Sequence, residues 1–155
     1  MTRVGLGAAG VLLVAAAVAL LMRPSGPTMS ALGGLLRLRV APEWRIVHDE
    51  PRRLTIERPG DQNYAVMSIT WEPADAERTI TLTDARPTVG AMIAGEAHVV
   101  IADYTTMPSG ERVSRFRVVF RRQGRDWQAQ LLVRPEADPA VVQQYRDMLA
   151  SWDWT

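Results

Sequence analysis

Two histidines are the residues best suited to acid–base or metal chemistry, and the first of them stands beside two acidic residues. His48, Asp49 and Glu50 could act as metal ligands or as an acid–base cluster if their side chains converged. Neighbouring side chains on an extended chain point in opposite directions, so these three cannot reach one ion. We therefore expect a solvated turn before Pro51.

No other arrangement of residues indicates catalysis. His98, near Glu96 and Asp103, is expected at the end of a helix. Cysteine is absent, which excludes disulfides, thiolate metal sites and a cysteine nucleophile. The sequence also lacks a Gly-x-Ser-x-Gly motif, a zinc-ligand spacing and a phosphate-binding loop. We predict a protein that is not an enzyme and that binds neither a metal nor a cofactor.

One cofactor-like motif occurs in an unsuitable place. The run Gly5-x-Gly7-x-x-Gly10 matches the dinucleotide-binding fingerprint. That fingerprint requires a strand before it and a helix start within it, whereas here it opens an apolar segment. Gly5 and Ala9 instead have the small-residue spacing that lets membrane helices pack closely.

Arginines are concentrated in one predicted β-hairpin. All 18 basic residues are arginines, and six lie close together: Arg112, Arg115, Arg117, Arg121, Arg122 and Arg125. Strand alternation puts Arg115, Arg117 and Arg121 on one face, away from Phe116 and Phe120. This face either is simply solvated, made arginine-rich by GC-rich coding, or contacts lipid headgroups or an acidic partner. The candidate contacts for a partner or lipid are Arg115, Arg117, Arg121, Arg122, Arg125 and Trp154.

The tryptophans divide between core and surface. Trp44, Trp71, Trp127 and Trp152 fall at positions that predict core packing. Trp154 follows the last predicted helix and is the best candidate for an exposed anchor to a partner.

An apolar segment opens the chain. Val4 to Met22 contains no charged residue and ends at Arg23 and Pro24. As a helix it would span about 28 Å, close to the hydrocarbon thickness of a bilayer. We predict an uncleaved transmembrane signal anchor over residues 1–23, with the following domain on the periplasmic side of a bacterial inner membrane. The alternative is a cleaved secretory signal with its site at Ala17-Val18-Ala19.

The rest of the chain predicts one domain. Residues 24–34 are rich in Gly, Pro and Ser and are expected to form a flexible linker before a domain at 35–155. The net charge of +1 argues against binding to nucleic acid. Alternating apolar residues predict strands at 36–40, 54–57, 65–71, 80–82, 115–120 and 127–133. A turn at Gln123-Gly124 predicts that the last two strands form a hairpin.

Two segments predict helices. Asp138 and Pro139 are an N-cap and a first helical residue, and the apolar residues that follow recur at helical spacing as far as Trp152. A second helix is expected from Pro87 to His98, although Gly90 and Gly95 disfavour it. Strands with a central and a C-terminal helix packed on them make an α+β fold with an antiparallel sheet.

Two short motifs resemble a known family. A strand leading into Ala41-Pro42-Glu43-Trp44, and a last helix ending in Ser151-Trp152, are similar to the PsbP-like and DcrB-like family of envelope domains. The likeness spans about residues 35–154. It implies an accessory role, because such domains mostly dock onto membrane complexes or assist their assembly.

Two functions are expected from this combination. The first is a non-catalytic accessory subunit of a bacterial membrane complex (respiratory, photosynthetic or secretory) that contacts neighbouring membrane subunits and the bilayer but no small-molecule substrate. The alternative is a tethered or secreted binding protein for a small ligand or an envelope component. A cavity between sheet and helix, lined by residues such as Trp71 and Trp127, would favour that alternative.

Overall fold

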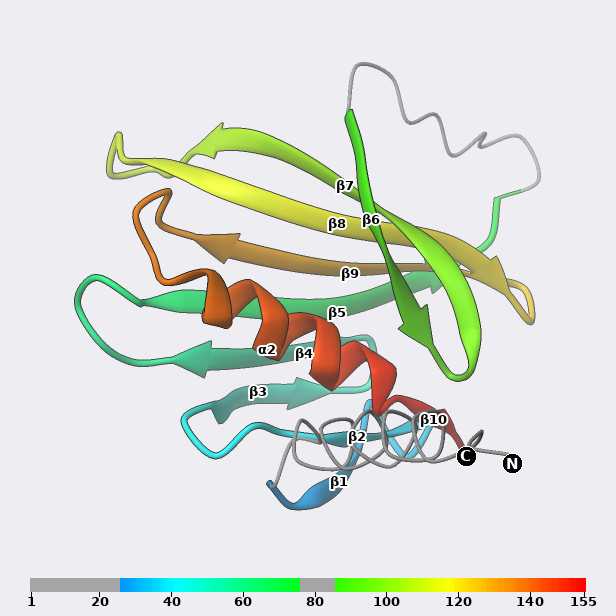
Figure 1. The fold of residues 1–155 in the computed structure, drawn as a ribbon. Helices are drawn as coiled ribbons and strands as arrows, with labels where there is room; N and C mark the ends of the chain where they lie inside the picture. Colours follow the sequence, from blue (N-terminus) through cyan, green and yellow to red (C-terminus); the bar gives the residue numbers. More distant parts are fainter. Residues whose placement is uncertain (1–25, 76–85) are drawn as a thin grey trace, which may run out of the picture.

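The computed structural model describes residues 26–75 and 86–155, and within them one large antiparallel sheet dominates. Its seven strands have the order β3-β4-β5-β9-β8-β7-β6 (Figure 1). Their bounds are β3 Arg45–Glu50, β4 Arg53–Arg58, β5 Ala65–Pro73, β6 Arg86–Ile93, β7 Glu96–Thr106, β8 Arg112–Arg122 and β9 Arg125–Val133. Every neighbouring pair of strands is antiparallel.

A small sheet and one helix complete the described part of the chain. Strands β1 (Thr28–Ala31), β2 (Leu36–Arg39) and β10 (Asp153–Trp154) form a second antiparallel sheet in the order β1-β2-β10. Helix α2 (Pro139–Ala150) lies across one face of the large sheet, with the small sheet beyond its C-terminal end (Figure 1). We call the face that contacts α2 the inner face.

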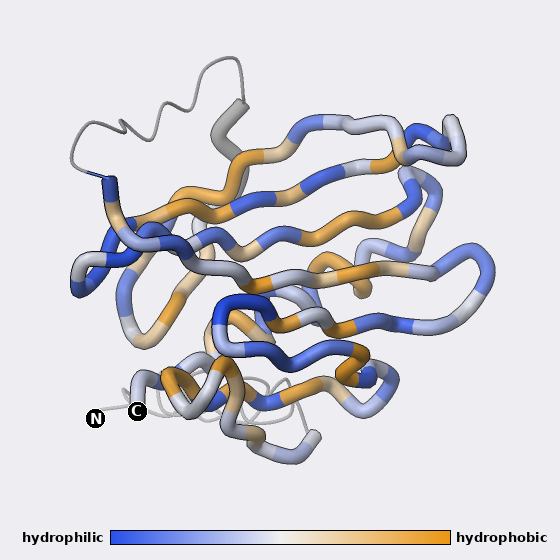
Figure 2. Tube along the Cα trace, turned by 180° about the vertical axis from the view of Figure 1, so that it is seen from behind, coloured by the Kyte–Doolittle hydropathy of each residue, from blue (hydrophilic) through white to orange (hydrophobic). Residues whose placement is uncertain are grey.

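The two faces of the large sheet follow the sequence alternation. On the inner face the buried side chains include Leu54, Ile56, Met67, Ile69, Ala129 and Leu131. They meet the buried side of α2, formed by Val141, Tyr145, Met148 and Leu149. The outer face carries polar residues such as Thr55, Ser68 and Gln130. Hydrophilic and hydrophobic residues alternate along the strands of the sheet (Figure 2). Hydrophobic burial on one face only therefore fixes the register of these strands.

The predicted C-terminal helix is confirmed, together with its caps. The Asp138 side chain accepts a hydrogen bond from the Ala140 amide, and Pro139 occupies the first turn. At the other end, the Ser151 hydroxyl donates to Met148 O at 2.7 Å and accepts from the Arg39 amide at 2.9 Å. Ser151 therefore ties the end of α2 to β2.

The predicted helix at 87–98 is wrong, and so is the α+β fold class that depended on it. This segment forms β6 and the start of β7, joined by a tight turn at Ala94 and Gly95, both with positive φ. Glycine adopts that conformation readily, and Thr88, Val89 and Ile93 are β-branched residues that favour strands. The described residues are therefore mainly β-sheet with a single C-terminal helix.

Some predictions fall on other parts of the chain. The anchor at 1–23, with Gly5 and Ala9, and the strand at 80–82 lie outside the described residues. Across residues 26–75 and 86–155, no helix is both long and apolar enough to cross a membrane. Strand β1 lies within the segment expected to be a linker, so ordered structure begins before Leu35.

Candidate functional site

The layer between α2 and the large sheet is filled with aromatic rings at one end. Phe120 on β8, Trp127 on β9, and Trp152 and Trp154 after α2 form what we call the aromatic cluster. The ring centroids of Trp127 lie 5.5 Å from Trp152 and 5.0 Å from Trp154, both at steep angles. Phe120 lies 5.9 Å from Trp152 and is stacked on Trp127 at 6.4 Å. Such tilted and offset contacts are favourable between aromatic quadrupoles.

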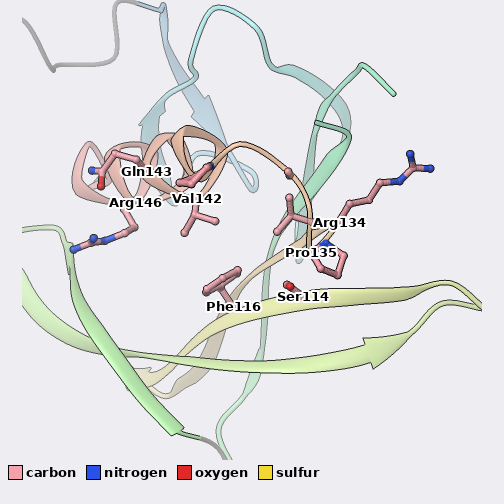
Figure 3. A pocket seen from close by; sticks show the side chains of 10 residues that line it. Ser114, Phe116, Arg134, Pro135, Val142, Gln143 and Arg146 are labelled. Atoms are coloured by element: carbon pink, nitrogen blue, oxygen red, sulfur yellow. The ribbon is translucent and has the colours of Figure 1, made fainter. Parts of the chain in front are cut away.

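The opposite end of the same layer is hollow. A cavity of about 380 Å³ lies between the first two turns of α2 and the ends of β8 and β9 (Figure 3). Its apolar walls come from Phe116, Val133, Pro135, Ala137, Pro139 and Val142. Ser114, Arg134, Gln143 and Arg146 supply its polar groups. Few polar groups among apolar walls, at a volume of this size, are typical of small-molecule sites.

The local sequence explains why space remains here. The chain leaves β9 at Val133 and reaches α2 at Pro139 through a short turn that contains Pro135. The cavity is lined by small or short side chains, such as Ser114, Ala137 and Val142, where the other end of the layer has tryptophan. The side chain of Phe116 faces α2 across the cavity (Figure 3).

A buried tyrosine separates the filled end from the hollow end. Tyr145 lies midway along α2, is fully buried, and donates from its hydroxyl to Ala129 O at 3.1 Å. Burial raises the pKa of the Tyr145 hydroxyl far above its ordinary value. The hydroxyl therefore stays protonated at physiological pH and serves as a fixed hydrogen-bond donor between α2 and β9.

The two arginines of the cavity differ in their partners. Arg134 forms an ion pair with Glu111 at 2.8 Å and also donates to Asp61 O at 2.8 Å. Arg146 donates from Nη2 to Gly90 O on β6 at 2.8 Å. Among the described residues, no carboxylate lies within ion-pair distance of Arg146, and its buried Nε has no hydrogen-bond partner. One full positive charge at the cavity is therefore not neutralised by a described side chain.

The arginine-rich hairpin has the predicted geometry, with its charges largely paired. Arg115 binds Asp103 through Nε at 2.7 Å and Nη2 at 2.5 Å, and Arg117 contacts the same carboxylate at 3.1 Å. The hydrogen bond from Arg115 keeps the pKa of Asp103 below its ordinary value. Arg121 binds Asp126 at 2.6 Å. These pairs reduce the net positive charge of the outer face, and its contact with a lipid or partner stays a prediction.

Two other hairpin arginines contact tryptophan rings. Arg122 lies 4.7 Å from the centre of the Trp154 ring and pairs with Glu96 at 3.3 Å. Arg125 and Arg52 lie 4.7 Å and 5.1 Å from the centre of the Trp71 ring. Trp154, predicted as an exposed anchor, is half-buried within the aromatic cluster and pairs with β2 through β10. Its role in binding a partner stays a prediction.

The histidines occupy strands. His48 is exposed on β3, while neighbouring Asp49 accepts a hydrogen bond from the Leu32 amide at 2.8 Å. His98, expected at a helix end, instead lies on β7, where its ring is tilted against that of Phe120 at a centroid distance of 4.7 Å. Within 26–75 and 86–155, no group of acidic and histidine residues is arranged to hold a metal ion.

The cavity lies where sequence reasoning did not place it. The expected lining residues Trp71 and Trp127 contact each other at 6.2 Å, at the filled end of the layer. For the residues that do line the cavity, such as Phe116 and Val142, the sequence pattern predicted only which side of the strand or helix faces the core. The difference in side-chain size between Ser114 and Phe120, at the two ends of β8, was the one sequence feature that indicated different packing at the two ends of the layer.

Comparisons with known proteins show similarity at the level of fold. No protein-family model matches the sequence, so the resemblance to the PsbP-like and DcrB-like family is not confirmed, and no curated protein matches it either. A protein of Bacteroides thetaiotaomicron VPI-5482 is similar in structure, with a TM-score of 0.62 and 9% identity over 84% of this chain. This chain spans about half of that protein, 48% of its length.

A second structure is more distant. LpqN of Mycobacterium tuberculosis, described as involved in cell envelope biogenesis, has a TM-score of 0.47 and 15% identity. The match covers 84% of this chain and 86% of LpqN. The Bacteroides structure supports the fold alone, and the likeness to LpqN is too distant to support a function.

Proposed function

We propose that this chain is a non-catalytic binding protein that holds a small molecule in the cavity between α2 and the large sheet. The observation that carries the proposal is the uneven filling of one layer. The aromatic cluster, together with Trp71 against Trp127, fills one end. The other end keeps a cavity of about 380 Å³ with mostly apolar walls. Cavities of roughly 300–1,000 Å³ with a few polar groups are the usual small-molecule sites.

The location that we propose is the bacterial cell envelope. The apolar run from Val4 to Met22 supports a membrane tether, because it has the length and composition of a single spanning helix. The binding domain would then meet its ligand close to the membrane surface.

The absence of cysteine allows a direct test. A Ser114→Cys variant places the chain's single thiol in the cavity wall, and a Ser68→Cys variant places it on the outer face of β5. The full chain, in nanodiscs of zwitterionic lipid, is treated with a maleimide in the presence of 1-decanol or decanoate. We expect either compound to slow labelling of residue 114 and to leave residue 68 unaffected. Equal labelling of residue 114 with and without both compounds would contradict the proposal.

A second candidate function is an accessory subunit of a membrane complex. The observation that favours it is a group of exposed apolar side chains in the β6–β7 hairpin. Met92 is 45% and Val99 is 54% exposed, and both point to the outer face. Such side chains outside a core are typical of protein contact surfaces. Purification in mild detergent should retain stoichiometric subunits with the wild type and lose them with Val99→Arg.

A further inference from the structure

We infer that the ligand of this cavity is an amphipathic anion, with its acidic group on Arg146 and its apolar body against Phe116 and Val142. This inference rests on the proposed function and specifies the chemical class of the ligand. The inference follows from three properties of the cavity. They are the guanidinium of Arg146, which no described carboxylate neutralises, the apolar walls beside this guanidinium, and the volume of the cavity.

Arg146 and Val142 belong to the same side of α2. They are four residues apart, so their side chains are neighbours on the helix surface. Both line the cavity, where Phe116 lies opposite Val142 and the guanidinium of Arg146 is directed toward β6 (Figure 3). One surface of the helix thus offers an apolar contact and, one turn later, a cation.

The guanidinium of Arg146 is positioned without being neutralised. Its partner on β6, Gly90 O at 2.8 Å, is a neutral acceptor. The hydrogen bond to Gly90 O holds Arg146 beside the cavity and occupies one donor of Nη2, while Nε is buried away from solvent. The remaining donors of the guanidinium can bind a carboxylate or phosphate oxygen.

Three acidic side chains near the cavity have other partners. Glu111 pairs with Arg134, the Asp138 carboxylate caps α2, and Asp147 accepts a hydrogen bond from Gln143 at 2.8 Å. None of these contacts directs a carboxylate to Arg146. The described surroundings therefore favour an anion over a cation or a neutral molecule.

The volume sets the size of the apolar body. At about 30 Å³ for each water-sized group, a cavity of about 380 Å³ accommodates roughly a dozen non-hydrogen atoms. Decanoate has a comparable size and combines one carboxylate with an unbranched apolar chain. 1-Decanol has the same chain without the charge, and is the matched neutral probe.

The test compares these two probes in the Ser114→Cys chain, in zwitterionic nanodiscs at pH 8. We expect decanoate to protect residue 114 at about one-tenth of the free concentration that 1-decanol requires, on the scale of one charge-assisted hydrogen bond. Adding Arg146→Gln should abolish this preference, so that both compounds protect at similar free concentrations, and Arg146→Lys should retain part of the preference. Arg112→Gln is the control, because Arg112 stacks on Tyr104 and does not line the cavity.

The outcomes separate the two proposals. Equal protection by decanoate and 1-decanol would overturn the assignment of an anion and leave the binding function supported. Protection by neither compound would overturn the binding function. A preference for decanoate that survives Arg146→Gln but disappears with Arg112→Gln would assign the charge to another site and contradict the role of Arg146.

Discussion

The two ends of the layer between α2 and the large sheet are built on the same elements and differ in side-chain volume. At the filled end, β8 contributes Phe120, β9 contributes Trp127, and Trp152 follows the helix. At the hollow end, the same strands contribute Ser114 and Val133, and the helix contributes Val142. Large side chains therefore close one end, and mostly smaller ones leave the other open.

Because of this difference, we expect the filled end to contribute mainly to stability and the hollow end mainly to binding. Stability depends on dense apolar packing, and the aromatic cluster with the neighbouring core provides it. A binding site needs space, which forfeits some of that packing. Tyr145 lies between the two regions and fixes the helix to β9 by a buried hydrogen bond. Variants at each end should therefore move different observables.

The largest effect is expected from truncation in the aromatic cluster. Trp152 is 2% exposed and contacts Phe120, Trp127 and Trp154. Trp152→Ala should lower the free energy of unfolding by about 3–5 kcal/mol, because it removes a buried indole and leaves a cavity. Chemical denaturation of the full chain in nanodiscs, followed by circular dichroism, measures this loss. The matched variant Val142→Ala should cost less than about 1.5 kcal/mol; similar losses would contradict the division between the two ends.

The sequence predicted the filled end better than the hollow end. Strand alternation placed Trp127 in the core, and helical spacing placed Trp152 there, because each pattern reports which side of an element is buried. Neither pattern reports how much volume the opposing elements leave. The cavity lies between three segments that are separate in the sequence and include Ser114, Val133 and Val142. Only tertiary packing brings these segments together.

The same limit explains the wrong helix. Apolar residues between Pro87 and His98 fit a helical stripe, but Gly95 and β-branched residues fit a hairpin equally well. The pairing of β6 with β7 decides between them, because the strand adds to the edge of an existing sheet. Arg146 reaches its partner Gly90 only in that arrangement, so its position could not be inferred without the correct fold.

The next effect concerns the boundary between the two ends. Tyr145→Phe removes the hydroxyl that donates to Ala129 O and keeps the ring volume. The loss of one buried hydrogen bond should cost about 1–1.5 kcal/mol. Denaturation measures the loss, and amide exchange near Ala129 should increase. Unchanged stability would show that the Tyr145 hydrogen bond does not help to hold α2 on the sheet.

A smaller effect of opposite sign is expected from filling the hollow end. Val142→Phe should add roughly 0.5–1 kcal/mol of stability, because the extra ring enters open apolar space. It should also abolish protection of a thiol at residue 114 by 1-decanol. Ala150→Phe, at an exposed position of the same helix, is the control and should change neither observable. Destabilisation by Val142→Phe would show that the walls cannot accept a larger group.

The smallest effect is expected when acid weakens the ion pair between Arg115 and Asp103, which lies on the outer face of the sheet behind the hollow end. Here Phe116 and Ala102 face inward as a cross-strand pair, while Arg115 and Asp103 form the adjacent pair outside. The Arg115 hydrogen bond lowers the pKa of Asp103 in the folded state, so this contact stabilises the fold above the unfolded pKa of about 3.9 and loses its contribution as pH falls further. Because both side chains are about a quarter exposed, the contribution should be at most about 1 kcal/mol. Between pH 5 and pH 3, the wild type should therefore lose slightly more thermal stability than Asp103→Asn. Identical pH profiles would show that the ion pair between Arg115 and Asp103 contributes nothing measurable to the stability of the fold behind the cavity.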